Sequence, residues 1–437
     1  MEVEMKTKED ILALLEEEDV EFVRLQFTDM FGNLKNAAVT ARQLERVLDH
    51  DYAFDSCAMF NQNGGKGEDI YLKPDLDTFV ILPWRPQQGK VARLLCDVYT
   101  QSGEPYEMSS RRILQKVIDE AKKKGYTFFV DPECEFFLFH TDENGMPTAL
   151  THEQAGYMDV GPVDLGENAR REMVLTLEEM GFEIESSHHE AAPAQHEIDF
   201  QEAEALAMAD SIVTFKSAVR SIARRFGLHV TFMPKPKSGV AGSGLHLNFS
   251  LYKEGKNLFS LGEKGEVSQE ALMFMGGIMA HAKAICAISN PLVNSYKRLI
   301  TGFDAPLEML WTVGNQNAML RLRNRRGENS KIELRFPDPS SNPYLVIALA
   351  LAAGMDGIDR RLNPGKEANA LMADAGQVET LPMSLREAVG YLRQDKLLEQ
   401  VLGQEFTDIY CKAKMQEWNT YMAQVSDWEV ETYLNRV

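Results

Sequence analysis

The first hundred residues of the chain carry two apolar patterns, one at helical spacing and one that alternates with polar residues. Apolar residues three or four positions apart are typical of amphipathic helices, and alternation is typical of half-buried strands. The predicted helices are 11–18 and 41–48, and the predicted strands are 22–27, 37–40, 78–82 and 91–99. The first two strands flank a polar turn and predict a hairpin. This pattern predicts a small α+β domain, residues 1–105, that ends in the polar turn 101–105.

Residues 106–437 continue the alternation of strands and helices over a greater length and predict a larger α+β domain. Its predicted strands are 127–139, 197–200, 229–233, 245–251 and 331–336. Its predicted helices are 109–124, 168–180, 204–226, 269–289 and 343–361, followed by a tail that is helical throughout from 384 onward. The pattern contains no internal repeat and no low-complexity segment.

The apolar stretches predict a buried core and no membrane span. The longest, 344–355, is shorter than the roughly 18 apolar residues that a spanning helix needs, so we expect a buried helix. The segment 1–20 is charged and acidic, unlike a signal peptide. Five cysteines without metal or redox spacing are typical of a reducing compartment. We therefore expect a soluble cytoplasmic protein.

The charge balance narrows the range of partners. The 66 acidic residues outnumber the 46 basic ones and give a formal net charge of −20. Such a surface disfavours non-specific binding of nucleic acids and of anionic membranes. Most of the acids are expected to be solvated, although a carboxylate-rich chain can commit a few of them to cations.

Two glutamates interrupt an otherwise apolar predicted strand. The run Phe128-Phe-Val-Asp-Pro-Glu-Cys-Glu-Phe-Phe-Leu-Phe139 places Glu133 and Glu135 two positions apart, on one face of the strand. Adjacent carboxylates in an apolar setting repel and are poorly solvated, and a cation between them would relieve both costs. An edge strand whose acids face water explains the pattern equally well, so both interpretations stay open at this point.

A second polar cluster is Ser186-Ser-His-His-Glu-Ala-Ala-Pro-Ala-Gln-His-Glu-Ile-Asp-Phe200. Pro193 excludes one continuous helix and, with it, a zinc-peptidase motif. A loop that leads into a strand could direct Glu190 and Glu197 into one site. Taken alone, a polar surface loop with a chance group of histidines explains this cluster better.

A third segment, Gly242-Ser-Gly-Leu-His-Leu-Asn-Phe-Ser250, begins with glycines that let the backbone approach a ligand closely. His246 then opens an alternating strand, although a lone strand histidine is more often a satisfied core residue. The run Ile332-Glu-Leu-Arg-Phe336 places Glu333 and Arg335 on the polar side of a short strand.

These segments together offer five glutamates and one histidine, an oxygen-rich set that suits Mg²⁺ or Mn²⁺ better than zinc. A basic stretch with arginines at 321, 323, 325 and 326 indicates a phosphate clamp or a subunit interface. Cation ligands and arginines without a Walker sequence indicate phosphoryl transfer by another architecture.

From about residue 21 to its C-terminus, the chain resembles the type I glutamine synthetases of bacteria and archaea. The matching runs are 22–27, 71–75, 133–139, 164–168, 181–187, 197–200, 232–236, 294–299 and 342–345. The resemblance implies a β-grasp-like N-terminal domain. It also implies a catalytic domain with a curved antiparallel sheet, flanking helices and a helical tail.

The resemblance also implies a site with two or more divalent cations. One set of ligands would be Glu135, Glu190 and Glu197, and the other would be Glu133, His246 and Glu333. Arg298 and Arg335 would bind substrate carboxylates and the transferring phosphoryl group. The backbone near Gly242 would contact glutamate, Ser250 and Lys331 would lie near ATP, and Arg321 would join the phosphate clamp.

The implied reaction joins ammonium, or a small amine, to the side-chain carboxylate of glutamate. ATP first converts that carboxylate to a γ-glutamyl phosphate, because phosphate leaves far more readily than hydroxide. An acid beside the amine must take its surplus proton. The resemblance further implies a homo-dodecamer of two hexameric rings in which Asp55 acts in the neighbouring subunit's site.

Several positions depart from the family pattern. The loop Asp55-Ser-Cys-Ala-Met59 has alanine where the family has a second serine, although Asp55 and Tyr157 remain as ammonium contacts. Asp304 stands where the family presents a glutamate base, which shortens its reach by one methylene. A displacement of that size can cost on the order of a hundredfold in rate. Ala194 replaces a glycine between two of the implied ligands.

The nucleotide clamp also differs. Gln316 stands where the family has arginine and cannot supply its charge, and Lys331 replaces another arginine. Arg323 or Arg325, at positions where the family has small uncharged residues, could compensate. Three interpretations follow: a working glutamine synthetase, a γ-glutamylamide ligase that uses an organic amine, or an impaired paralogue with a regulatory or structural role. The six intact ligands favour an enzyme, since unused buried carboxylates are costly.

Overall fold

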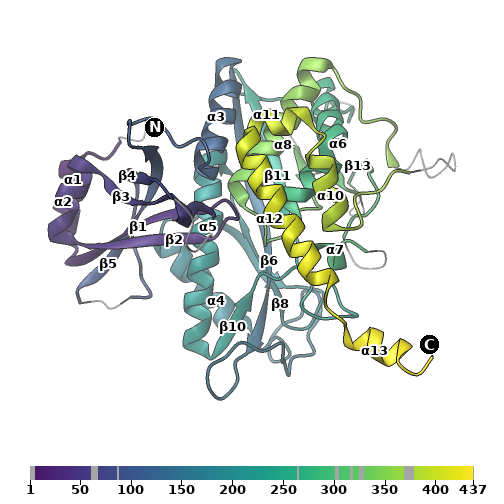
Figure 1. The fold of residues 1–437 in the computed structure, drawn as a ribbon, viewed down its shortest axis with the longest axis horizontal. Helices are drawn as coiled ribbons and strands as arrows, with labels where there is room; N and C mark the ends of the chain where they lie inside the picture. Colours follow the sequence, from purple (N-terminus) through teal and green to yellow (C-terminus); the bar gives the residue numbers. More distant parts are fainter. Residues whose placement is uncertain are drawn as a thin grey trace.

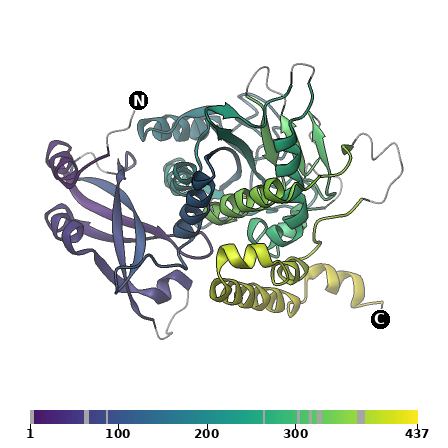
Figure 2. The ribbon, with the colours of Figure 1, turned by 90° about the horizontal axis from the view of Figure 1, so that it is seen from above.

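The computed structural model describes residues 5–60, 67–85, 88–262, 265–300, 305–314, 318–323, 329–368 and 378–436. Two β-sheets organise the described chain, and each belongs to its own α+β domain (Figure 1). The smaller domain lies to one side of the larger one, and the C-terminal helices pack beside the larger domain (Figure 2). This architecture confirms the α+β fold class.

The N-terminal domain is a five-stranded sheet in the order β2-β1-β5-β4-β3, with two helices. Its elements are α1 (Lys8–Glu17), β1 (Val20–Thr28), β2 (Leu34–Thr40), α2 (Ala41–His50), β3 (Tyr52–Asp55), β4 (Asp69–Ile81) and β5 (Lys90–Thr100). The predicted hairpin is present as the antiparallel pair β1 and β2. Its turn closes on Asp29, whose Oδ1 accepts hydrogen bonds from the amides of Phe31 and Asn33 at 3.0 and 2.9 Å.

The larger domain is built on a ten-stranded, mainly antiparallel sheet whose main path runs β13-β14-β15-β11-β6-β8-β7. Its strands are β6 (Tyr126–His140), β7 (Ile184–His189), β8 (Gln195–Phe200), β9 (Ala203–Glu204), β10 (Leu228–Thr231), β11 (Leu245–Lys253), β12 (Lys256–Asn257), β13 (Trp311–Val313), β14 (Leu320–Arg323) and β15 (Lys331–Leu334). The long strand β6 pairs with β11 on one side and with β8 on the other. It is therefore an interior strand, and the edge-strand interpretation is wrong.

Helices cover the sheet of the larger domain and form most of its core. They are α3 (Ser110–Lys123), α4 (Glu167–Glu179), α5 (Ala205–Ala223), α6 (Gln269–Ser289), α7 (Ser295–Arg298), α8 (Pro343–Arg360), α10 (Leu385–Leu392), α11 (Lys396–Leu402), α12 (Gln404–Met422) and α13 (Asp427–Tyr433). The stretch 344–355 lies within α8 and is almost wholly buried, as predicted. By length and composition α6 could cross a membrane, but 72% of its apolar window is buried inside the protein, where it packs against α8.

A buried arginine joins the two domains. Arg111 of α3 pairs with Asp75 and Asp97, on β4 and β5 of the N-terminal sheet, at 2.6 Å each. It also pairs with Asp210 of α5 at 2.9 Å. A guanidinium offers several donors in a fixed plane, so one side chain can hold three carboxylates at once. This contact fixes the position of the N-terminal sheet relative to the larger domain.

The predicted elements differ from the observed ones mainly where an element is short or polar. The strands β3, β7, β13 and β14 were not predicted, and β4 begins nine residues before the predicted 78–82. The C-terminal tail is interrupted between α10 and α11, at Gly403 and between α12 and α13, so it is not helical throughout. Gly403 has a φ of +87°, a conformation that ends the preceding helix and that glycine adopts without strain.

Candidate active site

The predicted acidic residues gather on one face of the larger domain's sheet, at its centre. Glu133 and Glu135 project from the same face of β6 because they are two residues apart. The register places His246 of β11 opposite Glu133 and Glu197 of β8 opposite Glu135. Adjacent antiparallel strands thus bring residues from distant parts of the sequence side by side.

The first group consists of Glu133, His246 and Glu333, whose ligand atoms lie within 4.8 Å of one another. His246 Nδ1 is 3.2 Å from Glu133 Oε2 and 3.9 Å from Glu333 Oε1. These three residues come from the neighbouring strands β6, β11 and β15. The structure therefore brings one of the two expected ligand sets together.

The second group differs in one member from the expected set. Glu190 and Glu197 form a group with His188, whose ligand atoms all lie within 4.8 Å of one another, and Glu135 is not a member of it. His188 Nε2 is 2.9 Å from Glu190 Oε1 and 3.9 Å from Glu197 Oε2. Glu135 lies between the two groups: its Oε2 accepts hydrogen bonds from Gln195 Nε2 at 2.8 Å and the Gly244 amide at 3.0 Å.

The carboxylates of this face are crowded and poorly solvated. Burial and the neighbouring charge of Glu190 raise the pKa of Glu135 to about 8. Burial and the charges of Asp199 and Glu135 raise the pKa of Glu197 well above its usual range. Burial opposes ionisation of Glu133 too, but the hydrogen bond and charge of His246 and the charge of Arg323 outweigh it and lower its pKa. The carboxylates of this face therefore repel one another, and a bound cation would relieve that repulsion.

One unsatisfied buried nitrogen fits a cation at this face. His246 Nε2 is buried without a hydrogen-bond partner among the described residues, and it lies 3.8 Å from Glu135 Oε1. Burial and the charge of Arg335 lower the pKa of His246, which favours the neutral imidazole that binds metals. Carboxylate oxygens with one imidazole suit Mg²⁺ or Mn²⁺. The donor set thus fits divalent cations.

Two glycines hold the backbone close to these side chains. A Cβ at Gly244 would lie 2.6 Å from Arg298 Nη2, 2.8 Å from His246 Nε2 and 3.1 Å from Glu135 Oε1. A Cβ at Gly242 would lie 2.3 Å from the carbonyl oxygen of Pro234. Any side chain at either position would displace the site, so both glycines are required by close approach.

Arginines surround the cluster. Arg298, 2% exposed, donates to the carbonyl oxygens of Arg335, Phe336 and Pro337 at 2.9–3.2 Å. Arg321 Nη1 donates to Glu333 Oε2 at 3.1 Å, and Arg335 Nη1 donates to Glu333 Oε1. These guanidinium groups give the face positive charge beside its carboxylates.

Ser250 and Lys331, both expected near the nucleotide, meet at a common carboxylate. Ser250 Oγ is 3.2 Å from Glu202 Oε2, and Lys331 Nζ is 2.9 Å from the same oxygen. Lys331 also pairs with Asp131 at 2.9 Å. Ser250 lies on β11 and Lys331 on β15, the strands that carry His246 and Glu333.

Comparison with known proteins accounts for this arrangement. The family model for the catalytic domain of glutamine synthetase matches residues 107–433, and the model for its beta-Grasp domain matches residues 19–101. The chain belongs to the glutamine synthetase family. This membership makes it an ATP-dependent carbon–nitrogen ligase of the glutamate–ammonia type.

Individual relatives match over nearly the whole chain. A glutamine synthetase of Clostridium saccharobutylicum is 51% identical over 438 residues, which cover 98% of this chain and 99% of the relative. One from Thermus thermophilus is 45% identical over 98% and 99% of the two chains. A solved structure of GmaS without ligand has a TM-score of 0.88 at 32% identity, covering 98% of this chain and 99% of that chain.

The remaining expected residues of this glutamine synthetase family member lie around the cluster, in the other domain or outside the described chain. Tyr157 lies beside the second group, with its ring 5.5 Å from that of His188. Burial and the charges of Glu190 and Glu197 raise the pKa of Tyr157. Asp55 ends β3 in the N-terminal sheet, where its Oδ1 accepts the Cys57 amide at 2.7 Å. The predictions for Asp304 and Gln316 fall outside the described residues.

Sequence reasoning missed several residues that contact the cluster. The sequence indicated only a chance group of histidines at His188, no contact for Gln195, and for Asn248 no more than a place on the strand. The alternation along β11 places Asn248 on the same face as His246, and its Nδ2 is 3.2 Å from Glu133 Oε1. That alternation was the available signal. Nothing in the sequence indicated that Gln195 would reach across to Glu135.

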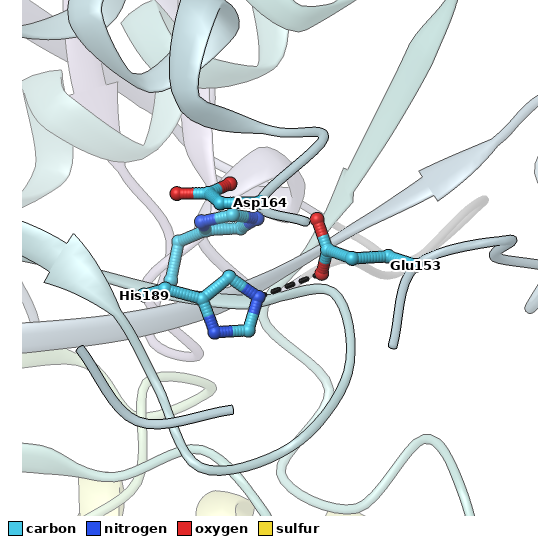
Figure 3. A group of neighbouring side chains, drawn as sticks. Glu153, Asp164 and His189 are labelled. Atoms are coloured by element: carbon cyan, nitrogen blue, oxygen red, sulfur yellow. Dashed lines mark hydrogen bonds and ion pairs between the residues drawn. The ribbon is translucent and has the colours of Figure 1, made fainter. Parts of the chain in front are cut away.

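A second polar cluster lies next to the site, and Figure 3 shows three of its members, Glu153, Asp164 and His189, with His189 directed at the carboxylate of Glu153. His189 Nε2 is 2.7 Å from Glu153 Oε1, and its Nδ1 is 2.7 Å from the carbonyl oxygen of Glu190. Burial opposes charge on His189, but the hydrogen bond to Glu153 outweighs it and raises its pKa. Arg170 pairs with Asp164 at 2.8 Å. Within this cluster, each of the two carboxylates thus faces a basic side chain, and His189 links the cluster to the backbone of Glu190.

Proposed function

We propose that the chain forms glutamine from glutamate, ammonium and ATP through a γ-glutamyl phosphate, and that the cluster around Gly244 is where it does so. The observation that carries the assignment is the arrangement of two carboxylate–histidine groups on either side of Glu135, with Arg298 directly beside Gly244. Glutamate, ATP and a divalent cation together bring a large negative charge. An interior face with both carboxylates and arginines can hold that charge in place.

The residues divide into a phosphate side and an amine side. Glu133, His246 and Glu333 would hold one Mg²⁺ or Mn²⁺ ion, and Glu135, Glu190 and Glu197 would hold another. Bound there, the cations neutralise the phosphates and the substrate carboxylate. Arg321 and Arg335, already beside Glu333, bind the transferring phosphoryl group. Lys331 and Ser250 bind the nucleotide from β15 and β11, the strands that carry Glu333 and His246.

On the amine side, Arg298 orients glutamate and Tyr157 contacts ammonium. The backbone at Gly242 receives the main chain of glutamate, because no side chain blocks it there. Asp304 takes the surplus proton of the attacking amine, and Gln316 contacts the nucleotide without supplying charge. Asp55 acts in the site of the neighbouring subunit, which explains its place in the other sheet.

The proposal includes a cytoplasmic homo-dodecamer of two hexameric rings. Exposed apolar side chains on two projecting segments support it. The helix α13 contains no buried residue and exposes Trp428, Val430 and Tyr433, with Leu434 just beyond it. It extends away from the body of the subunit at the C-terminus (Figure 1). The loop that contains Tyr157 likewise exposes Val160 and Leu165. Exposed apolar side chains gathered on one segment are typical of interaction sites.

Phosphate release from ATP tests the proposal. The wild-type protein with glutamate and Mg²⁺ is assayed with ammonium and, separately, with a panel of small amines and polyamines. We expect ammonium-dependent release and formation of glutamine. Glu333→Gln is the loss-of-function variant, with an expected fall in kcat of about a hundredfold or more. Its thermal unfolding controls for folding. Release only with an organic amine would transfer the chain to the γ-glutamylamide ligases, and silence across the panel would support the non-catalytic paralogue.

A further inference from the structure

Arg323, the last residue of β14, forms an ion pair inside the proposed cation site. Its Nη1 donates to Glu133 Oε1 and, at 3.1 Å, to Asn248 Oδ1. Arg323 lies two residues after Arg321, so both side chains project from the same face of the strand. Arg321 pairs with Glu333 in the same way. The two carboxylates of this ligand group are therefore both held by arginines of β14.

The ion pair with Arg323 uses the carboxylate of Glu133, which a bound cation would need as a ligand. Glu133 Oε2 already lies 3.2 Å from His246 Nδ1, and Arg323 takes Oε1. A divalent cation bound by Glu133, His246 and Glu333 would share Glu133 with a guanidinium of like charge. Two positive charges that contact the same carboxylate repel each other strongly when the site is partly buried. Cation binding and the Arg323–Glu133 pair therefore oppose each other.

The side chain of Arg323 is less confined than those of Arg335 and Arg298, so it can move away from Glu133 more easily. Its side chain is 25% exposed, whereas the side chain of Arg335 is 9% exposed. Arg298 is fixed by its three carbonyl contacts. A released guanidinium at this position faces the side of the site that holds Lys331 and Arg321, and its planar fork suits a phosphate.

We infer that Arg323 is an exchangeable cation that links cation binding to nucleotide binding. It neutralises Glu133 until a divalent cation binds there, and it then pairs with a phosphate of the nucleotide. Each ligand thereby favours the other, because the cation frees the arginine and the phosphate keeps it away from Glu133. Such coupling is reciprocal by thermodynamic necessity. The inference rests on the proposed function, which places the cation and the nucleotide at this face.

Binding measurements without turnover test the inference. Free Mn²⁺ is measured by electron paramagnetic resonance in the presence of the full-length protein, with and without ADP, and ADP affinity is measured at several Mn²⁺ concentrations. In the wild type, each ligand should tighten the other by the same factor. In Arg323→Gln, Mn²⁺ alone should bind more tightly, ADP should bind more weakly when Mn²⁺ is present, and the coupling factor should fall about tenfold.

Two further variants distinguish this role from simple support of the fold. Arg225→Gln removes an exposed arginine that lies 3.4 Å from Glu172 and should leave all three quantities unchanged. Arg323→Lys keeps the charge without the planar fork and should restore part of the coupling. Weaker binding of Mn²⁺ alone in Arg323→Gln, or an unchanged coupling factor, would overturn the inference. A wild-type protein that binds neither Mn²⁺ nor ADP would instead overturn the proposed function itself.

Discussion

Glu135 and Glu197 lie directly opposite each other on the paired strands β6 and β8, both buried. Cross-strand neighbours of like charge are destabilising, and burial increases the cost. A fold that keeps both carboxylates in its interior must gain from them when a ligand binds. This relationship connects the sheet register to the proposed cation site.

Replacement of Glu135 by glutamine should show how much the buried pair of carboxylates destabilises the metal-free fold. Glu135→Gln removes a group whose pKa burial and Glu190 raise to about 8, so the metal-free protein should unfold at a higher temperature than the wild type. The same change removes a ligand, and the increase in Tm on addition of Mg²⁺ should largely disappear. Thermal unfolding with and without Mg²⁺ measures both effects. An undiminished Mg²⁺-induced shift in the variant would contradict the assignment of Glu135.

The close approach at Gly244 predicts a sharp effect of one methyl group. Gly244→Ala should lower kcat/KM by about a hundredfold, because its Cβ would displace Arg298, His246 or Glu135. Gly390→Ala is the matched control: its Cβ meets nothing within 4 Å, and it lies inside α10, where alanine is the better helix former. Steady-state kinetics of both variants would show whether the effect is local. Equal activity of the two variants would count against the site.

The network around Glu153 should couple stability to cation affinity. Glu153→Ala leaves His189 and the amides of Leu165 and Ala194 without their acceptor, and should destabilise the fold by about 3–5 kcal/mol. Because His189 also binds the carbonyl oxygen of Glu190, Mn²⁺ affinity should fall as well. Urea unfolding and Mn²⁺ titration measure the two effects. Glu179→Ala, on the exposed side of α4, is the control, and a similar loss there would refute the specific role.

His281 predicts a pH dependence of stability that is independent of the active site. Its Nδ1 is 2.6 Å from Asp395 Oδ2 and its Nε2 is 3.3 Å from Asp356 Oδ2. Burial lowers its pKa, but the hydrogen bonds and charges of the two aspartates outweigh burial and raise it above the unfolded value of about 6.5. The stabilisation is therefore complete below about pH 6.5 and is lost as the pH rises through the higher folded value.

The variant His281→Gln should lose less stability than the wild type as the pH rises. Between pH 6 and 9 the Tm of the wild type should fall by more than the Tm of the variant. The exposed His50 supplies the control, since His50→Gln should retain the wild-type slope. Parallel curves for all three proteins would show that His281 carries no such linkage.

The C-terminal helix predicts a change in assembly. Removal of residues 424–437 deletes α13 and its exposed apolar side chains, and none of the residues 424–436 is buried in the subunit. If α13 binds across the two rings, the truncated protein should form smaller particles, which light scattering after size-exclusion chromatography would measure. An unchanged particle mass would remove α13 from the interface.

Strong periodic patterns were sufficient to predict most long elements. The helix 269–289 has the predicted bounds. The predicted helix 343–361 extends one residue beyond α8, and the predicted strand 127–139 is one residue shorter than β6 at each end. The missed strands are short or polar: β7 reads Ile-Glu-Ser-Ser-His-His and gains its place from pairing with β8. Tertiary pairing of this kind leaves no apolar alternation in the strand itself.

The site was only partly accessible from the sequence. The spacing of Glu133 and Glu135 places them on one face, but it cannot decide whether that face is an edge. The pairing of β6 on both sides decided it. The family resemblance supplied the remaining residues. Contacts between side chains from distant strands, such as Arg323 with Glu133, depend on the register and could not be derived from either source.

Anomalous diffraction from crystals grown with Mn²⁺ and ADP would test the central claim most directly. The account predicts one Mn²⁺ peak at Glu133, His246 and Glu333 and a second at Glu190 and Glu197, with Glu135 in contact. It also predicts Arg323 turned away from Glu133 towards the ADP phosphates. Mn²⁺ bound instead within the Glu153–Asp164 network, or no Mn²⁺ peak at this face of the sheet, would contradict it.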